Sequence, residues 1–135
     1  MNTRIDIQTC RDQHTAIRLL LDELSKCEGS EQKLVGLLER LNRILLAHLR
    51  LEDDWLYPKL LQNDNAKVAE TAKRFSEEMG GLKAAFVSVF KTWTAPGAIA
   101  ADHDGFCVAW NAFHAQLEQR MQREDDDLYV LASNA

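Results

Sequence analysis

Apolar residues recur at steps of three and four along nearly the whole chain, which is the period of an amphipathic α-helix. Three short breaks rich in polar residues, glycine or proline interrupt the pattern, at residues 28–30, 63–65 and 94–97. The segments between the breaks predict helices over residues 9–27, 31–61, 66–93 and 103–131.

Strand signals are absent from the sequence, which has neither alternating Val/Ile/Thr runs nor an Asn-Gly hairpin. Amphipathic helices joined by short connections predict an all-α fold, an up-down-up-down four-helix bundle, in one domain over residues 1–135. Pro58 is expected to end or kink the second helix, because its ring cannot pack against the preceding turn.

The two halves of the chain share a pattern. The segment H-T-A-I-R-L-L-L-D-E-L, from His14, has the apolar spacing of M-G-G-L-K-A-A-F-V-S-V, from Met79. The stretch E-D-D-W-L-Y at Glu52 is also repeated, as E-D-D-D-L-Y at Glu124. The chain is therefore interpreted as two copies of a helical hairpin, which a bundle would relate by an approximate two-fold axis.

Ionisable side chains interrupt the apolar stripes of three helices. They are His14, His48, Glu52 and Glu124. At about 100° per residue, His48 and Glu52 point within about 20–30° of the core direction of their helix, one turn apart. Buried ionised carboxylates need a positive partner, and a metal ion satisfies carboxylate oxygens and neutral imidazole nitrogens together. The four residues therefore predict a site for iron, zinc or manganese.

Each residue also has an interpretation without a metal. His14 can be a hydrogen-bonded core histidine, and His48 and Glu52 can bond to each other. Either glutamate can lie at a partly solvated edge of the bundle. The inward direction of all four, from three helices, is what favours the metal.

These residues resemble the hemerythrin-like (HHE cation-binding) domain family. Its motif has a histidine on the first helix and H-x-x-x-E, followed by an apolar-aromatic-proline ending, on the second. His14 and H-L-R-L-E-D-D-W-L-Y-P from His48 match this motif, and the resemblance covers essentially the whole chain. It implies a four-helix bundle that holds a non-haem di-iron centre through histidines and two bridging carboxylates.

The second half departs from the family pattern at two ligand positions. Met79 stands where the third helix should carry a histidine, and Arg120 replaces the histidine four residues before Glu124. Methionine is a poor ligand for an oxygen-rich iron site. The chain is therefore identified as a divergent member with an incomplete second metal half-site, expected to bind one metal ion or none.

A competing register lies on the same helix, where His114-A-Q-L-Glu118 resembles H-L-R-L-E at His48. Glu118 points about 100° from the core direction and Glu124 only about 20° from it. This count favours Glu124 and leaves His114, at about 60°, as a flanking candidate ligand.

Two interpretations of Arg120 stay open. Pointing inward, its guanidinium can bind the carboxylates of both Glu52 and Glu124 in place of the second cation. Pointing outward, its charged end reaches water from the edge of the stripe.

Composition and charge limit the kinds of partner that the protein is expected to bind. The net charge of −5 argues against nucleic acid, and no apolar run approaches the roughly 18 residues of a membrane span. The N-terminal residues lack the apolar core of a secretory signal. Cys10, Cys27 and Cys107 form no C-x-x-C pair, so reduced thiols that act as small buried hydrophobes, in a cytoplasmic protein, are expected.

Two functions follow. The first is a non-enzymatic protein that holds one iron, or zinc, and, as the resemblance implies, binds or senses oxygen or nitric oxide. The second is a metal-free bundle that serves as a regulatory or protein-interaction module. A ferritin-like oxidase is disfavoured, because no Glu-x-x-His pair occurs. The sequence indicates no particular protein partner and fits a monomer or a homodimer.

Overall fold

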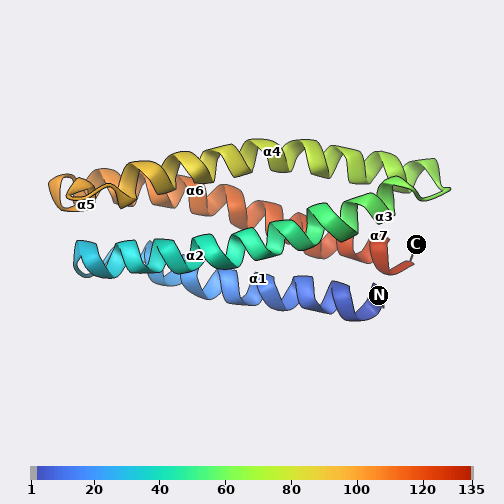
Figure 1. Cartoon of the computed structure of the whole chain (residues 1–135), viewed down its shortest axis with the longest axis horizontal. Helices are drawn as coiled ribbons and strands as arrows, with labels where there is room; N and C mark the ends of the chain where they lie inside the picture. The colour runs from blue at the N-terminus through green and yellow to red at the C-terminus, as the bar shows by residue number, and fades with distance from the viewer. Residues whose placement is uncertain (1–2, 135) are drawn as a thin grey trace.

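A computed structural model describes the backbone of residues 3–134 and the side chains of residues 7–134. Long helices run side by side along one axis, and consecutive ones point in opposite directions (Figure 1). The elements in chain order are α1 (Thr3–Ser25), α2 (Glu31–Leu51), η1 (Glu52–Leu56), α3 (Tyr57–Leu61), α4 (Ala66–Thr94), α5 (Ala98–Ala101), α6 (His103–Arg123), η2 (Glu124–Leu128) and α7 (Tyr129–Asn134). The predicted all-α, up-down-up-down four-helix bundle is confirmed.

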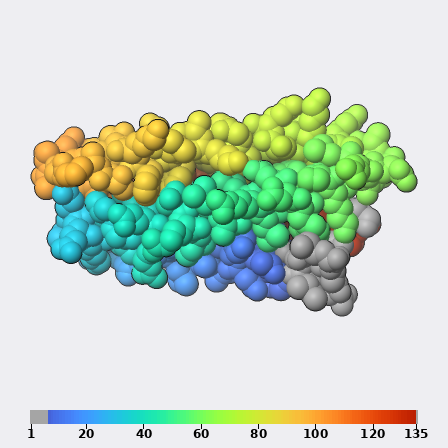
Figure 2. Space-filling model, in the orientation of Figure 1, coloured from blue at the N-terminus to red at the C-terminus, as the bar shows by residue number. Residues whose placement is uncertain are grey.

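Some of these elements follow each other without a break and together form one helix of the bundle. Its second helix is α2, η1 and α3 in succession, and its fourth is α6, η2 and α7. Side chains of the second and third bundle helices cover most of the face shown in Figure 2, and atoms of α1 (blue) are visible along its lower edge. None of the helices in the described part of the chain is both long enough and apolar enough to cross a membrane.

Short polar side chains define where three of the bundle helices begin. Ser30 accepts a hydrogen bond from the backbone N–H of Lys33, and Asn65 accepts one from Lys67. Asp102 accepts one from the N–H of Gly105. Each oxygen satisfies a donor that the first helical turn leaves unpaired, so the predicted starts at residues 31, 66 and 103 are confirmed.

Both η segments are single π-helical turns, and they fall on the repeated E-D-D-x-L-Y stretch. In each turn a tyrosine N–H bonds to the carbonyl of the glutamate five residues earlier, Tyr57 to Glu52 and Tyr129 to Glu124. Pro58 was expected to end or kink the helix, and of these alternatives the first is wrong, since helical structure continues to Leu61. Proline is also not required for the turn, because the second copy forms it without one.

The apolar core is divided into two clusters. On α1, for example, Cys10 belongs to one cluster and Ile17 to the other. His14 lies between them and is fully buried. The same order holds on the second and fourth bundle helices, so a polar layer crosses the middle of the core.

A disulfide joins Cys27, just after α1, to Cys107, in the first turns of α6, with 5.8 Å between the Cα atoms. The expectation of reduced thiols is therefore wrong for this pair. The two cysteines are 80 residues apart in sequence, and only the packing of the bundle brings them together. Cys10 is fully buried, as expected of a small core residue.

Candidate metal centre

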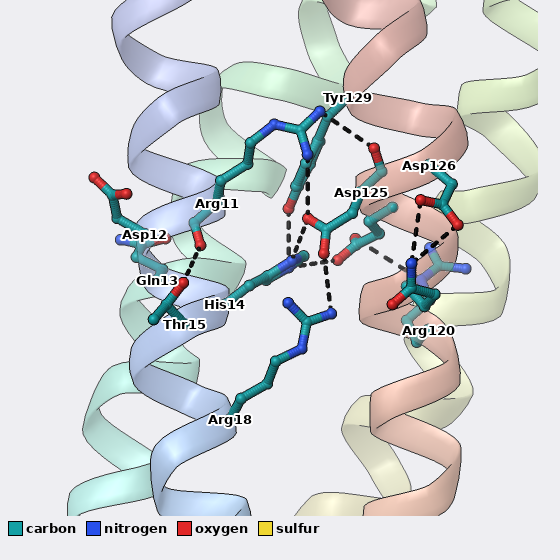
Figure 3. Close-up of polar contacts among 12 residues, drawn as sticks. Arg11, Asp12, Gln13, His14, Thr15, Arg18, Arg120, Asp125, Asp126 and Tyr129 are labelled. Atoms are coloured by element: carbon teal, nitrogen blue, oxygen red, sulfur yellow. Dashed lines mark hydrogen bonds and ion pairs between the residues drawn. The ribbon is translucent and has the colours of Figure 1, made fainter.

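The polar layer contains all four residues that the sequence predicted to face inward. His14, Glu52 and Glu124 are 0% exposed and His48 is 2% exposed. His14 extends from α1 towards the fourth bundle helix, where Asp125 and Tyr129 meet it (Figure 3). The inward orientation predicted for the four side chains is confirmed.

Three donor atoms converge on one point in this layer. His14 Nε2 lies 3.1 Å from His48 Nε2 and 3.0 Å from Glu124 Oε1. His48 Nε2 lies 3.7 Å from the same oxygen of Glu124. Two imidazole nitrogens and a carboxylate oxygen at this spacing form a group that could hold a metal ion.

Glu52 extends the group. Its Oε1 atom lies 2.8 Å from His48 Nε2, yet it makes no hydrogen bond of acceptable geometry among the described residues. Glu124 Oε2 is likewise buried without a hydrogen-bond partner in this part of the chain. Carboxylate oxygens left unpaired in an apolar core cost free energy, and a cation among them would remove that cost.

The spacing of the donors fits one metal ion. Ligands about 2.1 Å from a metal and at right angles to one another lie about 3.0 Å apart. The separations of 3.0 and 3.1 Å from His14 Nε2 match this value, and the third, 3.7 Å, is somewhat longer. Imidazole with carboxylate is a donor set that suits iron or zinc.

Outer contacts orient both histidines. His14 Nδ1 lies 3.0 Å from Asp125 Oδ1, and His48 Nδ1 lies 2.8 Å from Gln13 Oε1. Arg18 in turn donates to Asp125 Oδ2 at 2.9 Å, as Figure 3 shows. An acceptor at Nδ1 directs the lone pair of Nε2 inward, as in most histidine metal sites.

These outer partners were missed in the sequence. Gln13 directly precedes His14, and Asp125 directly follows Glu124 in an acidic run that a solvated helix end explains equally well. Position next to a candidate ligand was the available signal. It is a weak one, because neighbours on a helix point about 100° apart.

Tyr129 was missed as well. Its hydroxyl lies 3.0 Å from His14 Nε2, and 3.4 Å from both His48 Nε2 and Glu52 Oε2. A regular α-helix would place residue 129 about 140° from Glu124, off the inward face. The π-helical turn, which bonds five residues apart, brings the tyrosine back towards that face. The repeated tyrosine of E-D-D-x-L-Y was the signal in the sequence.

Arg120 points inward, and its side chain is 5% exposed, so the interpretation that it reaches water is wrong. Its Nε atom lies 3.8 Å from Glu124 Oε2. The rest of the guanidinium donates to Glu78, to the Tyr57 hydroxyl and to the carbonyl of Phe75. Arg120 therefore places a positive charge beside one carboxylate, and the predicted fork over both carboxylates is not what the described contacts form.

Met79, His114 and Glu118 all lie outside the group of donor atoms on His14, His48 and Glu124. Met79 is buried in the apolar cluster that contains Ile17. His114 bonds to the Ser25 hydroxyl, and Glu118 pairs with Arg18 at 2.8 Å. Neither His114 nor Glu118 belongs to that group, which favours the Glu124 register.

In the metal-free protein, protons on neighbouring groups neutralise the buried carboxylates. Burial opposes a charge on His48, but attraction to Glu52 and Glu124 outweighs it and raises the pKa of His48 to about 10. Burial, together with the nearby charge of Glu124, raises the pKa of Glu52 to about 8. Burial also opposes the charge on Glu124, yet hydrogen bonds from His14 and His48 hold its pKa well below the usual range. Protons thus take the place of a cation in the metal-free protein.

Comparison with known families matches nearly the whole chain to one family. The family model described as the hemerythrin HHE cation binding domain matches residues 6–132, which include every residue of the polar layer. Comparisons with curated proteins and with solved structures gave no match.

Proposed function

The chain belongs to the hemerythrin HHE cation-binding domain family, and on that basis we propose that it holds one metal ion, iron by preference over zinc. The ligands would be His14, His48, Glu52 and Glu124. The convergence of both Nε2 atoms and Glu124 Oε1 within 3.0–3.7 Å of one another, inside the core, carries the proposal.

Arg120 and Met79 favour one ion per chain. A guanidinium has only N–H donors and cannot coordinate a metal. With its Nε 3.8 Å from Glu124 Oε2, Arg120 would also repel a second divalent ion beside that carboxylate. Arg120 would thus supply the charge, though not the chemistry, of the missing second metal.

A diatomic molecule is the ligand we propose for the bound metal. Two histidines and two carboxylates leave one or two positions open in an octahedral shell. Non-haem iron with an open position supplies the chemistry for binding oxygen or nitric oxide. The donors are sealed in the core, which suits a ligand of two atoms better than an organic substrate, so we infer binding or sensing and not catalysis.

A pocket of about 250 Å³ between α4 and α6 borders Arg120. Its lining includes Glu78, Gly81 and Arg120. Because Arg120 also lies beside Glu124, a molecule in this pocket is separated from the centre by the guanidinium.

A metal-free bundle that serves as a regulatory or interaction module is the second candidate. It is favoured by the charges already present in the protein. A protonated His48, with its raised pKa, and the buried Arg120 offset the charge of Glu124, while the raised pKa of Glu52 favours the neutral form of that carboxyl.

Metal stoichiometry separates the two candidates. The protein is reconstituted anaerobically with ferrous iron, desalted, and analysed for iron by mass spectrometry. One iron per chain is expected, with loss in His48→Ala and retention in His114→Ala, the matched control outside the centre. Near-zero iron in the unmutated protein would promote the metal-free bundle, and two irons would contradict the role assigned to Arg120.

The role of Arg120 has its own test. The double variant Met79→His/Arg120→His restores both histidines that the family pattern expects, so its iron content should rise towards two per chain. Met79→His alone retains the guanidinium and should stay at one. If the double variant also stays at one, Arg120 is not what limits the site.

A further inference from the structure

We propose that Tyr129 is a fifth ligand and that its phenolate oxygen binds the same ion as His14 and His48. The inference rests on the proposed function and goes beyond it. The hydroxyl lies 3.0 Å from one histidine Nε2 and 3.4 Å from the other, and those two nitrogens are 3.1 Å apart. The three atoms thus form a triangle whose sides approximate the roughly 3.0 Å between neighbouring ligands of one ion.

The position of the hydroxyl is built into the fold. Tyr129 is fully buried, and its ring packs against the imidazole of His14, with 5.2 Å between the ring centroids. The guanidinium of Arg11 lies over the Tyr129 ring, 5.5 Å from the ring centroid. The π-helical turn before residue 129 directs the side chain into the centre, so no rotation is needed for the oxygen to reach the other donors.

In the metal-free protein the same contacts are hydrogen bonds, and a bound cation would take the place of their protons. The phenol oxygen lies within 3.4 Å of His14 Nε2, His48 Nε2 and Glu52 Oε2, so it can accept from the two imidazole N–H groups and donate its own proton to the carboxylate. A cation among the four groups interacts with all of them together.

Coordination by Tyr129 would require its phenol to lose a proton. The O–H bond of Tyr129 breaks as the oxygen–metal bond forms, and the proton leaves to solvent. Glu52 Oε2, 3.4 Å from the hydroxyl, is a near acceptor for its departure. No electron is transferred in this step. Glu52, Glu124 and Tyr129 would then supply three negative charges, which match the charge of ferric iron better than that of ferrous iron.

Tyr57 provides a matched comparison, because it is the equivalent tyrosine of the first E-D-D-x-L-Y copy. It is also buried and also follows a π-helical turn. Its hydroxyl, however, accepts a hydrogen bond from Arg120 Nη2 at 3.1 Å. The protein's own cation thus faces Tyr57, and the metal site faces Tyr129.

Visible and resonance Raman spectroscopy test the assignment. The protein is loaded with ferrous iron without oxygen, oxidised with ferricyanide, and desalted. We expect a phenolate-to-iron(III) charge-transfer band, and Raman modes of a coordinated phenolate, in the unmutated protein and in Tyr57→Phe. Tyr129→Phe should lose both signatures and bind iron about 10- to 100-fold more weakly.

Each failure has a distinct meaning. Iron bound at one per chain without phenolate signatures would overturn the role of Tyr129 and leave the proposed function standing. Signatures that persist in Tyr129→Phe would do the same. Absence of retained iron would overturn both proposals. The spectrum of the unmutated protein decides the question even if Tyr129→Phe does not fold, which circular dichroism would reveal.

Discussion

Replacing Arg120 with methionine tests whether the protein's own buried cation stabilises the second half of the centre. Methionine retains an apolar stem that can pack on Phe75, over which the guanidinium lies at 4.4 Å. It removes the charge beside Glu124 and the hydrogen bonds to Tyr57 and to the Phe75 carbonyl. The variant therefore isolates the charge and the hydrogen bonds from the packing.

The expected loss follows from burial. Removing one partner of a buried ion pair costs about 3–5 kcal/mol, because the other charge stays buried without it. Glu124 retains its contacts with His14 and His48, so the lower end of this range applies. We expect the free energy of unfolding of the metal-free protein to fall by about 3 kcal/mol.

Urea unfolding at pH 7, in the presence of a chelator, measures this loss. Arg123→Met is the control, since Arg123 binds the same Glu78 carboxylate at 2.6 Å and also lies over the Phe75 ring. Its side chain is 43% exposed, so its loss should stay below about 1 kcal/mol. Equal losses for the two variants would refute the reasoning, because burial beside Glu124 is the difference between them.

Other perturbations address the outer contacts, one surface ion pair and the disulfide. Gln13→Ala should weaken metal binding about 10- to 100-fold in a titration, whereas Gln8→Ala, at an exposed site, should not; equal affinities would mean that the outer contact does not orient its imidazole. A hydrogen bond and charges from arginines hold the pKa of Glu78 below its ordinary 4.5, so the ionised group adds stability above that pH, and the addition is lost as the pH falls through the lowered pKa. Glu78→Gln should accordingly cost less than about 1 kcal/mol at pH 7 and nothing at pH 2, and a loss independent of pH would contradict an ionic origin. Reducing the Cys27–Cys107 disulfide, which closes a loop of 80 residues, should lower the free energy of unfolding by about 4 kcal/mol, and an unchanged urea midpoint would argue against this stabilisation.

Much of the fold was predictable because helix formation leaves a local trace. Apolar spacing indicated the bundle helices, and the residues at the breaks indicated where three of them begin. The inward direction of His48 and Glu52 was predictable for the same reason, since both precede the π-helical turn or lie at its first residue. A count of about 100° per residue holds up to that point.

Beyond that turn a count of about 100° per residue no longer holds. Tyr129 follows the second π-helical turn, so a regular helix projects it off the inward face. The conformation of Arg120 was also beyond the sequence. Its guanidinium is bound by Glu78, Phe75 and Tyr57, which lie on other bundle helices.

The sequence by itself determined the helices, their inward faces and the family, and it predicted that Met79 and Arg120 stand at two ligand positions. Each of these depends on residue type and on spacing within one helix. Only the tertiary structure decided that His14, His48, Glu124 and Tyr129 meet within hydrogen-bonding distance, and that Cys27 pairs with Cys107. Such distances join atoms on different helices, and they are set by how the helices pack and by two extra-wide turns, neither of which spacing along one helix encodes.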